Sequence, residues 1–127
     1  MGDFRAFAVA VAYSAGAIIC HQLPERSFFW DERQLPVCAR CTGLYLGVAI
    51  GLAAWFVIRR LQMVERIAQP RQVVGALLIA AAPTALSWAT GVSGVWDGTN
   101  VIRASLALPL GVTVGAIVAA VAAKDLR

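Results

Sequence analysis

Long apolar runs recur four times along the chain and are separated by short polar segments. They cover residues 4–20, 37–58, 73–96 and 101–123. Each is close to the length of about 20 mostly apolar residues that a helix needs to cross a bilayer. The apolar residues are continuous instead of alternating with polar ones, which disfavours strands. The pattern predicts an all-α fold, a single domain over residues 1–127 that forms an integral membrane bundle of about four transmembrane helices.

The composition supports a membrane environment and argues against nucleic acid as a partner. Of the 127 residues, 60% are hydrophobic and 14% are charged, with a mean hydropathy of +0.73. Soluble domains average about 45–50% apolar and about 25% charged residues. The net charge is +4, but most basic residues flank the apolar runs and do not form a patch interleaved with aromatic residues. We expect the lipid bilayer, and no nucleic acid, as the partner.

The basic residues also predict an orientation in the membrane. With four spans, both termini share a side with the loop between the second and third spans. The basic residues on that side are Arg5, Arg59, Arg60, Arg66, Arg71, Lys124 and Arg127, and those on the other are Arg26, Arg33, Arg40 and Arg103. Positive residues favour the cytoplasmic side. We therefore expect a multi-pass protein of the cell (inner) membrane, with both termini in the cytoplasm.

Small residues recur every four positions on two of the predicted spans. The second span carries Gly43, Gly47 and Gly51, and the fourth carries Gly111 and Gly115, followed by two alanines at the same spacing. Small residues on one helix face allow helix backbones to approach closely in a membrane. We expect these faces to be packing surfaces, either within the chain or between copies in a homo-oligomer.

All three cysteines and the only histidine lie at one end of the first two spans. Cys20 and His21 end the first run, while Cys38 and Cys41 open the second. If these helices are antiparallel neighbours, the four side chains meet at one membrane depth. Cys38 and Cys41 are three positions apart, so they would share one face of a helix.

Three interpretations of this cysteine cluster remain open, and a metal site leads. Three thiolates and one imidazole form a tetrahedral set that suits zinc, and soft thiolates also suit other transition metals. In the second interpretation, Cys38 and Cys41 are the working pair of a thiol–disulfide oxidoreductase, with Cys20 as a resolving thiol. In the third, the cysteines only hold two helices together in a non-enzymatic structural or accessory protein.

Further polar residues are expected beside the cysteines at the same membrane edge. Arginines that converge on one place suit a phosphate or carboxylate, such as an anionic lipid headgroup or a small substrate. Arg26, Arg40, Asn100 and Arg103 are candidates for binding it, and Glu25 is a candidate general base. Secondary polar contacts are expected from Gln22, Ser27, Thr42 and Asp97.

Two blocks of the sequence resemble a known family of small predicted membrane proteins, domain of unknown function 2085. The first block is Cys20-His21-Gln22, Pro24-Glu25-Arg26-Ser27 and the run from Cys38 through Arg40, Cys41 and Thr42 to Gly43, and the second contains Asn100 and Arg103. The resemblance covers nearly the whole chain. It implies a membrane location and marks these residues as a signature, but it implies no activity.

Overall fold

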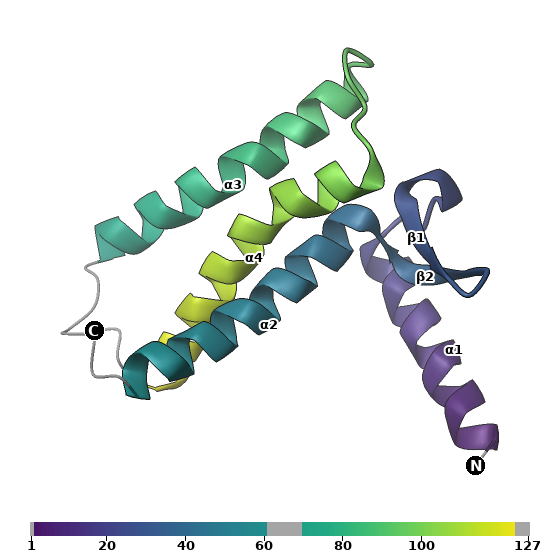
Figure 1. Ribbon diagram of the computed structural model, residues 1–127, viewed down its shortest axis with the longest axis horizontal. Coiled ribbons are helices and arrows are strands. Elements are labelled where there is room, and N and C mark those ends of the chain that lie inside the picture. The colour runs from purple at the N-terminus through teal and green to yellow at the C-terminus, as the bar shows by residue number, and fades with distance from the viewer. Residues whose placement is uncertain (1, 61–69, 124–127) are drawn as a thin grey trace.

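The computed structural model describes residues 2–60 and 70–123, and within them four long helices account for most of the chain (Figure 1). A short 3-10 helix and two strands lie between the first two helices. The elements are α1 (Gly2–Ile19), η1 (Pro24–Arg26), β1 (Ser27–Trp30), β2 (Arg33–Cys38), α2 (Ala39–Arg60), α3 (Pro70–Val92) and α4 (Asn100–Ala122). All four helices are long and apolar enough to cross a membrane. The predicted all-α membrane fold is confirmed.

A small β-hairpin connects α1 to α2, and the sequence pattern did not predict it. β1 and β2 pair antiparallel, with Ser27 opposite Cys38 and Trp30 opposite Arg33. The two turn residues, Asp31 and Glu32, have φ angles of 49° and 60°, as a tight type I′ hairpin turn requires. The strands are too short to show a clear alternation of polar and apolar residues. The hairpin moves the start of α2 to Ala39, two residues after the predicted start of the second span.

The closest packing in the fold is between α2 and α4, whose glycine faces meet each other. A Cβ atom added to Gly47 would lie 2.5 Å from the carbonyl oxygen of Leu108 and 2.9 Å from the Cα of Gly111. The backbones are therefore too close to admit even a methyl group, as small-residue membrane interfaces allow. These faces are packing surfaces, as predicted, and both are occupied within the chain. Of the two alternatives, the structure shows packing within the chain, and a homo-oligomer stays a prediction.

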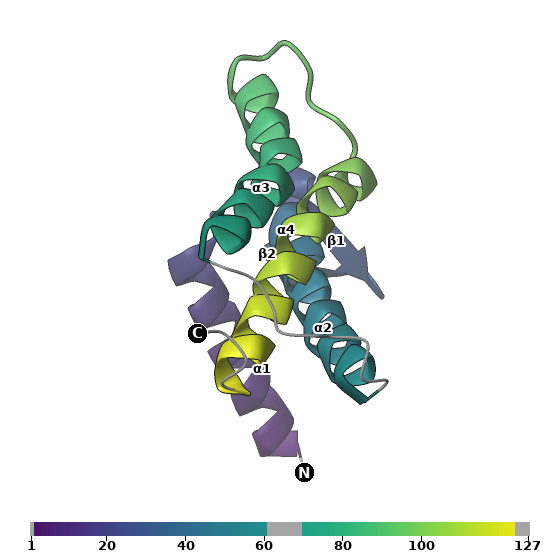
Figure 2. The same ribbon diagram turned by 90° about the vertical axis from the view of Figure 1, so that its left-hand side faces the viewer.

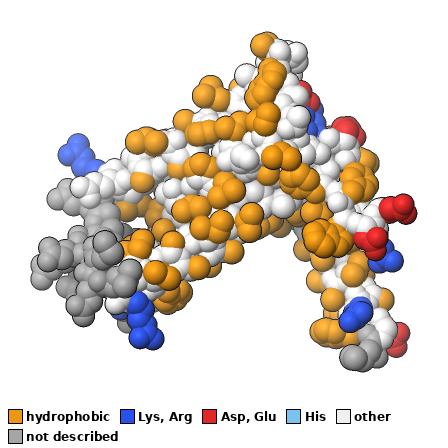
Figure 3. All heavy atoms as spheres, in the orientation of Figure 1, with side chains coloured by type: hydrophobic (Ala, Val, Ile, Leu, Met, Phe, Trp, Pro, Cys, Tyr) orange, Lys and Arg blue, Asp and Glu red, His pale blue; other side chains and the backbone are white. Residues whose placement is uncertain are grey.

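The other two helices pack less closely. α3 lies against α4, while α1 diverges from the bundle and meets the rest of the chain mainly at β2 (Figures 1 and 2). Hydrophobic side chains are spread over the sides of the helices, and charged ones gather toward the ends (Figure 3). Most large apolar side chains on the helices are exposed. A bilayer supplies the solvent that such a surface needs.

The direction of the helices places the hairpin and the α3–α4 turn at the same end of the molecule (Figure 1). This end carries the cysteines and the candidate arginines, and is called the site end below. Three basic residues used to predict the orientation, Arg66, Lys124 and Arg127, lie outside the described residues.

The close α2–α4 contact predicts a specific sensitivity to added volume. Gly47→Ala should lower the free energy of unfolding by about 1–3 kcal/mol, because the methyl group meets backbone atoms that cannot move aside. Unfolding in detergent, followed by tryptophan fluorescence, would measure the change. Gly75→Ala is the matched control, because a Cβ there has no atom within 4 Å and alanine is the better helix former. Equal stability of the two variants would contradict this packing.

Candidate metal centre and basic cluster

Cys20 lies immediately beyond the end of α1, where the chain turns toward the hairpin. Its backbone N–H still donates to the carbonyl of Gly16 at 2.8 Å, and Gln22 then adopts a positive φ of 47° that ends the helical path. The sulfur accepts a hydrogen bond from the backbone N–H of Cys38 at 3.3 Å. This contact ties the residue after α1 to the last residue of β2. The sequence analysis expected these cysteines to meet because the first two helices pack antiparallel, whereas in the structure α1 meets β2 and diverges from the other helices.

Cys38 and Cys41 lie on either side of a strand-to-helix junction, and not on one helix face as expected. Cys38 is the last residue of β2, and Cys41 lies in the first turn of α2. The Thr42 hydroxyl donates to the carbonyl of Cys38 at 3.0 Å and holds the junction. Because the chain bends here, the two sulfurs can converge on Cys20 without both having to point along one helix.

The three sulfur atoms lie within 4.8 Å of one another, and each cysteine is half-buried. With a zinc–sulfur distance of about 2.3 Å, the sulfurs of a tetrahedral site lie about 3.8 Å apart. Small side-chain rotations would bring the three thiols to that spacing. The cysteines are free thiols in this arrangement, so the cluster can provide three ligands to one soft or borderline metal ion.

The surroundings of Cys20 favour its thiolate form. Burial raises the pKa of the Cys20 thiol, but hydrogen bonds from the backbone of Gln22 and Cys38 and from the thiols of Cys38 and Cys41 outweigh it. The pKa of Cys20 therefore lies below its ordinary value. A thiolate is both the nucleophilic form and the metal-binding form of cysteine.

His21 and Glu25 lie outside the group formed by the three sulfurs. Both side chains are exposed, and among the described residues the set of close metal-ligating atoms contains the cysteines alone. Glu25 belongs to η1, which leads into the hairpin. The structure thus brings together three of the four predicted ligands and separates the fourth and the predicted general base from them.

Ser27 links the cysteines to the α3–α4 turn. It is 2% exposed, and its strand partner is Cys38. Its hydroxyl donates to the carbonyl of Leu23 at 2.9 Å, and its own carbonyl accepts from the Asn100 side-chain amide at 3.1 Å. Ser27 and Asn100 therefore hold the hairpin against the start of α4.

Three arginines and one aspartate form a second cluster at the site end, called the basic cluster below. Arg103 pairs with Asp97 and also donates to the Asn100 side-chain oxygen at 2.9 Å. Arg26 lies 3.6 Å from the other oxygen of Asp97. Arg40 donates to the carbonyl and hydroxyl oxygens of Ser87 on α3, at 2.9 and 3.3 Å. The structure thus gathers the predicted anion-binding residues, with Asp97 among them.

Arg103 is nearly fully buried in this cluster. Its hydrogen bond and its charge lower the pKa of its partner, Asp97. The hydrogen bond and charge of Arg103, aided by Arg26 and Arg40, outweigh the effect of burial and hold the pKa of Asp97 below its usual value. The Nε atoms of Arg40 and Arg103 are buried and have no hydrogen-bond acceptor among the described residues. A buried cationic group without a full set of acceptors is costly.

Two residues that help to build the site, Gln34 and Ser87, were not predicted as part of it, whereas Gln22 was. Gln34 donates to the carbonyl of Gln22 at 2.7 Å, and Gln22 itself donates to the carbonyls of Tyr13 and Pro36. These amides tie α1 to β2. Ser87 is the partner of Arg40, and its position as a polar residue within an apolar run was the available signal.

The family match extends from Cys20 to residue 117 and so contains all three cysteines and the whole basic cluster. The matching family is described as predicted membrane protein, DUF2085. The chain belongs to this family. The resemblance seen in the two sequence blocks is thereby confirmed, and the whole of α1 lies before the matched residues.

Two archaeal proteins are also similar to this member of the family. One, an uncharacterized protein of Methanocaldococcus jannaschii, is 34% identical over 101 residues, which are 80% of this chain and 62% of the relative. The other, an uncharacterized protein of Methanothermobacter thermautotrophicus, is 38% identical over 94 residues, 74% of this chain and 78% of the relative. The chain thus spans less than two thirds of the first relative. No solved structure matches it.

The lowered pKa of Asp97 predicts a loss of stability in acid. A carboxyl whose pKa falls on folding stabilises the native state above its ordinary pKa, and this contribution is lost as the pH drops below about 4. Asp97→Asn should therefore lower the unfolding temperature at neutral pH and flatten its dependence on acidic pH.

Thermal unfolding in detergent between neutral and acidic pH would test this. Asp31→Asn removes the same charge from an exposed hairpin turn and serves as the control. If Asp97→Asn and Asp31→Asn gave the same pH profile, the ion pair with Arg103 would not contribute.

Proposed function

We propose that this protein is a metal-binding membrane protein whose transition-metal ion, zinc in the first instance, is held by Cys20, Cys38 and Cys41. The observation that carries the proposal is the convergence of the three sulfurs within 4.8 Å, although the cysteines come from three different local structures. The lowered pKa of Cys20 supports a thiolate there. Three thiolates suit a borderline or soft cation better than a hard one.

The fourth position of the proposed centre is open in this arrangement. Structural zinc sites are closed by four protein ligands, whereas an open position admits water or a substrate. His21, which follows Cys20, stays a candidate for the fourth ligand if the segment after α1 rearranges. Glu25 stays a candidate general base on the exposed side of the same segment.

The alternative is a thiol–disulfide oxidoreductase that uses the same sulfurs. One observation favours it, since all three cysteines are free thiols close enough for any two to pair after small rotations. Cys38 and Cys41 would then be the working pair and Cys20 the resolving thiol, and the hydrogen bonds to Cys20 favour its thiolate by lowering its pKa. A metal is the stronger proposal, because it uses all three sulfurs and leaves no odd thiol.

We also propose that the basic cluster binds an anion. Arg26 and Arg103 pair with the carboxylate of Asp97, while Arg40 donates to neutral oxygens of Ser87, so the three arginines leave an excess of positive charge. Guanidinium groups bind phosphate and carboxylate through paired hydrogen bonds. The anion would lie on the same side of the membrane as the proposed metal, outward if the termini are cytoplasmic.

The metal proposal predicts about one metal ion per purified chain. Elemental mass spectrometry should find it in the wild type, and Cys20→Ser, Cys38→Ser and Cys41→Ser should each reduce it about tenfold or more. His21→Ala is the informative companion variant, because it should retain the metal if three thiolates suffice. Loss of metal in His21→Ala would contradict the three-thiolate site and make His21 the fourth ligand.

Thiol counting on the same samples separates the alternatives. Thiols that react with a thiol reagent only after denaturation with a chelator would support the metal. A metal-free protein with one disulfide and one free thiol would contradict it and favour redox chemistry or a simple link between helices.

The proposed orientation predicts cytoplasmic termini. Reporter domains that are active only in the cytoplasm should be active when fused to either end of the chain. A reporter inserted at the exposed Asp31–Glu32 turn should be inactive, since the hairpin lies at the opposite end. The reverse pattern would place the cysteines on the cytoplasmic side.

A further inference from the structure

The basic cluster carries two more positive charges than its own residues neutralise. The guanidinium groups of Arg26 and Arg103 pair with the carboxylate of Asp97, and that of Arg40 donates to neutral oxygens of Ser87. Arg103 is 6% exposed, and its Nε and that of Arg40 are buried without an acceptor among the described residues. Arg40 and Arg103 lie in the first turns of the membrane-spanning helices α2 and α4, where an ionisable group is costly and often marks a binding site.

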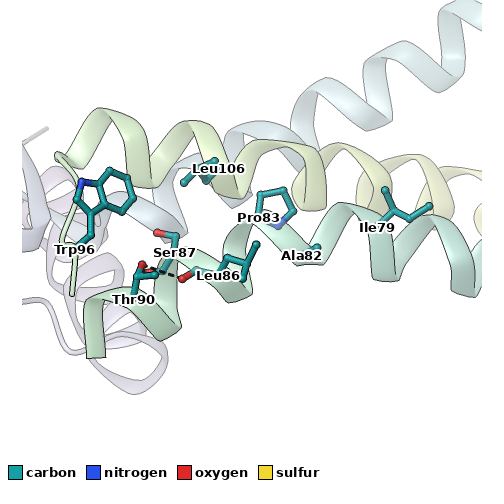
Figure 4. Close-up of a pocket in the computed structure, with 8 residues that line it drawn as sticks. All are labelled: Ile79, Ala82, Pro83, Leu86, Ser87, Thr90, Trp96 and Leu106. Carbon is teal, nitrogen blue, oxygen red and sulfur yellow. Dashed lines mark hydrogen bonds between the residues drawn. The ribbon is translucent and has the colours of Figure 1, made fainter. Parts of the chain in front are cut away.

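An apolar groove begins beside this cluster and runs along α3. It has a volume of about 390 Å³, and nearly all of its lining is apolar. Figure 4 shows Trp96, Ser87 and Thr90 at one end and Ile79 at the other. The twelve residues from Ile79 to Thr90 span eleven helical rises, roughly 16 Å of helix, so the groove descends well into the predicted membrane span.

Ser87 and Trp96 join the groove to the basic cluster. Ser87 lines the groove and accepts both hydrogen bonds from Arg40. Trp96 lines it as well and directly precedes Asp97 in the chain. A Cβ atom on Gly91 would lie 3.2 Å from Asp97 Oδ1 and 3.4 Å from Arg40 NH2, so the end of α3 contacts both charged groups.

We propose that this site binds a lipid phosphate monoester, with its phosphate at the basic cluster and its hydrocarbon tail in the α3–α4 groove. A phosphate monoester carries about −1.5 to −2 charges at neutral pH, which matches the two unneutralised positive charges. A carboxylate or a phosphodiester would neutralise only one. The proposal rests on the anion-binding part of the proposed function and is independent of the metal.

Within the site, the Arg26 side chain is accessible, whereas the Arg103 side chain is buried. The Arg26 side chain is 35% exposed and Arg103 is 6% exposed, and Asp97 holds both. A phosphate that approaches from the membrane surface would meet Arg26 first. Arg26 can therefore be replaced without removing the buried Arg103–Asp97 pair.

The direct test is ligand-induced stabilisation of the full chain in a neutral detergent. Three probes are compared: long-chain phosphatidic acid, diacylglycerol with the same chains, and inorganic phosphate. Phosphatidic acid should raise the unfolding temperature by several degrees. Diacylglycerol should not, because it lacks the phosphate, and inorganic phosphate should bind at least about tenfold more weakly, because it lacks the tail.

Two pairs of variants assign the two halves of the site. Arg26→Gln should weaken phosphatidic acid binding about tenfold, whereas Arg33→Gln, which removes the same charge from the exposed hairpin, should not. Ala82→Phe should fill the groove and weaken the lipid but not inorganic phosphate. Ala85→Phe, on the same helix but outside the groove lining, should leave both unchanged.

The possible outcomes are separable from those of the metal test. Equal stabilisation by diacylglycerol would overturn the proposal in favour of ordinary annular lipid. If inorganic phosphate bound as well as phosphatidic acid, or if Ala82→Phe and Ala85→Phe had equal effects, the hydrocarbon tail would not lie in the groove. Cys41→Ser should lose the metal and keep the phosphatidic acid response. Arg26→Gln should keep the metal and show a weaker phosphatidic acid response.

Discussion

The contact between the α2 and α4 backbones determines where the functional groups of this protein lie. Gly43 faces the backbone of Ala104, and the glycine series continues this register along both helices. Arg40 precedes Gly43 by about one turn and Arg103 directly precedes Ala104, so the contact brings both guanidinium groups to one level. A methyl group at these glycines would push α2 and α4 apart and would thereby move Arg40 away from Arg103.

From that base, Ser27 connects the basic cluster to the cysteines. The connection runs from Arg103 to Asn100, from Asn100 to the carbonyl of Ser27, and across the strand pair to Cys38, whose N–H reaches Cys20. Every step is a hydrogen bond or strand pairing in a part-buried region, where such contacts are strengthened by the low dielectric. The two candidate sites are therefore joined by one continuous series of contacts.

Their charges are also complementary. Three thiolates around a divalent ion would carry one net negative charge, next to a cluster that carries two unneutralised positive charges. The two proposals nevertheless stand separately, because the lipid site is built from the arginines and the groove and uses none of the three cysteines.

By itself the sequence determined the membrane class, the four helices and the small-residue packing faces, because continuous hydrophobicity and glycine spacing are local and periodic signals. It could not show the β-hairpin, whose strands are too short for a clear pattern, nor that Cys38 ends a strand. Only the tertiary structure decided that His21 lies apart from the sulfurs, that the glycine faces pair within the chain, and that Ser87 joins Arg40 to an apolar groove. Those facts depend on how segments far apart in the sequence approach one another, which local and periodic patterns do not encode.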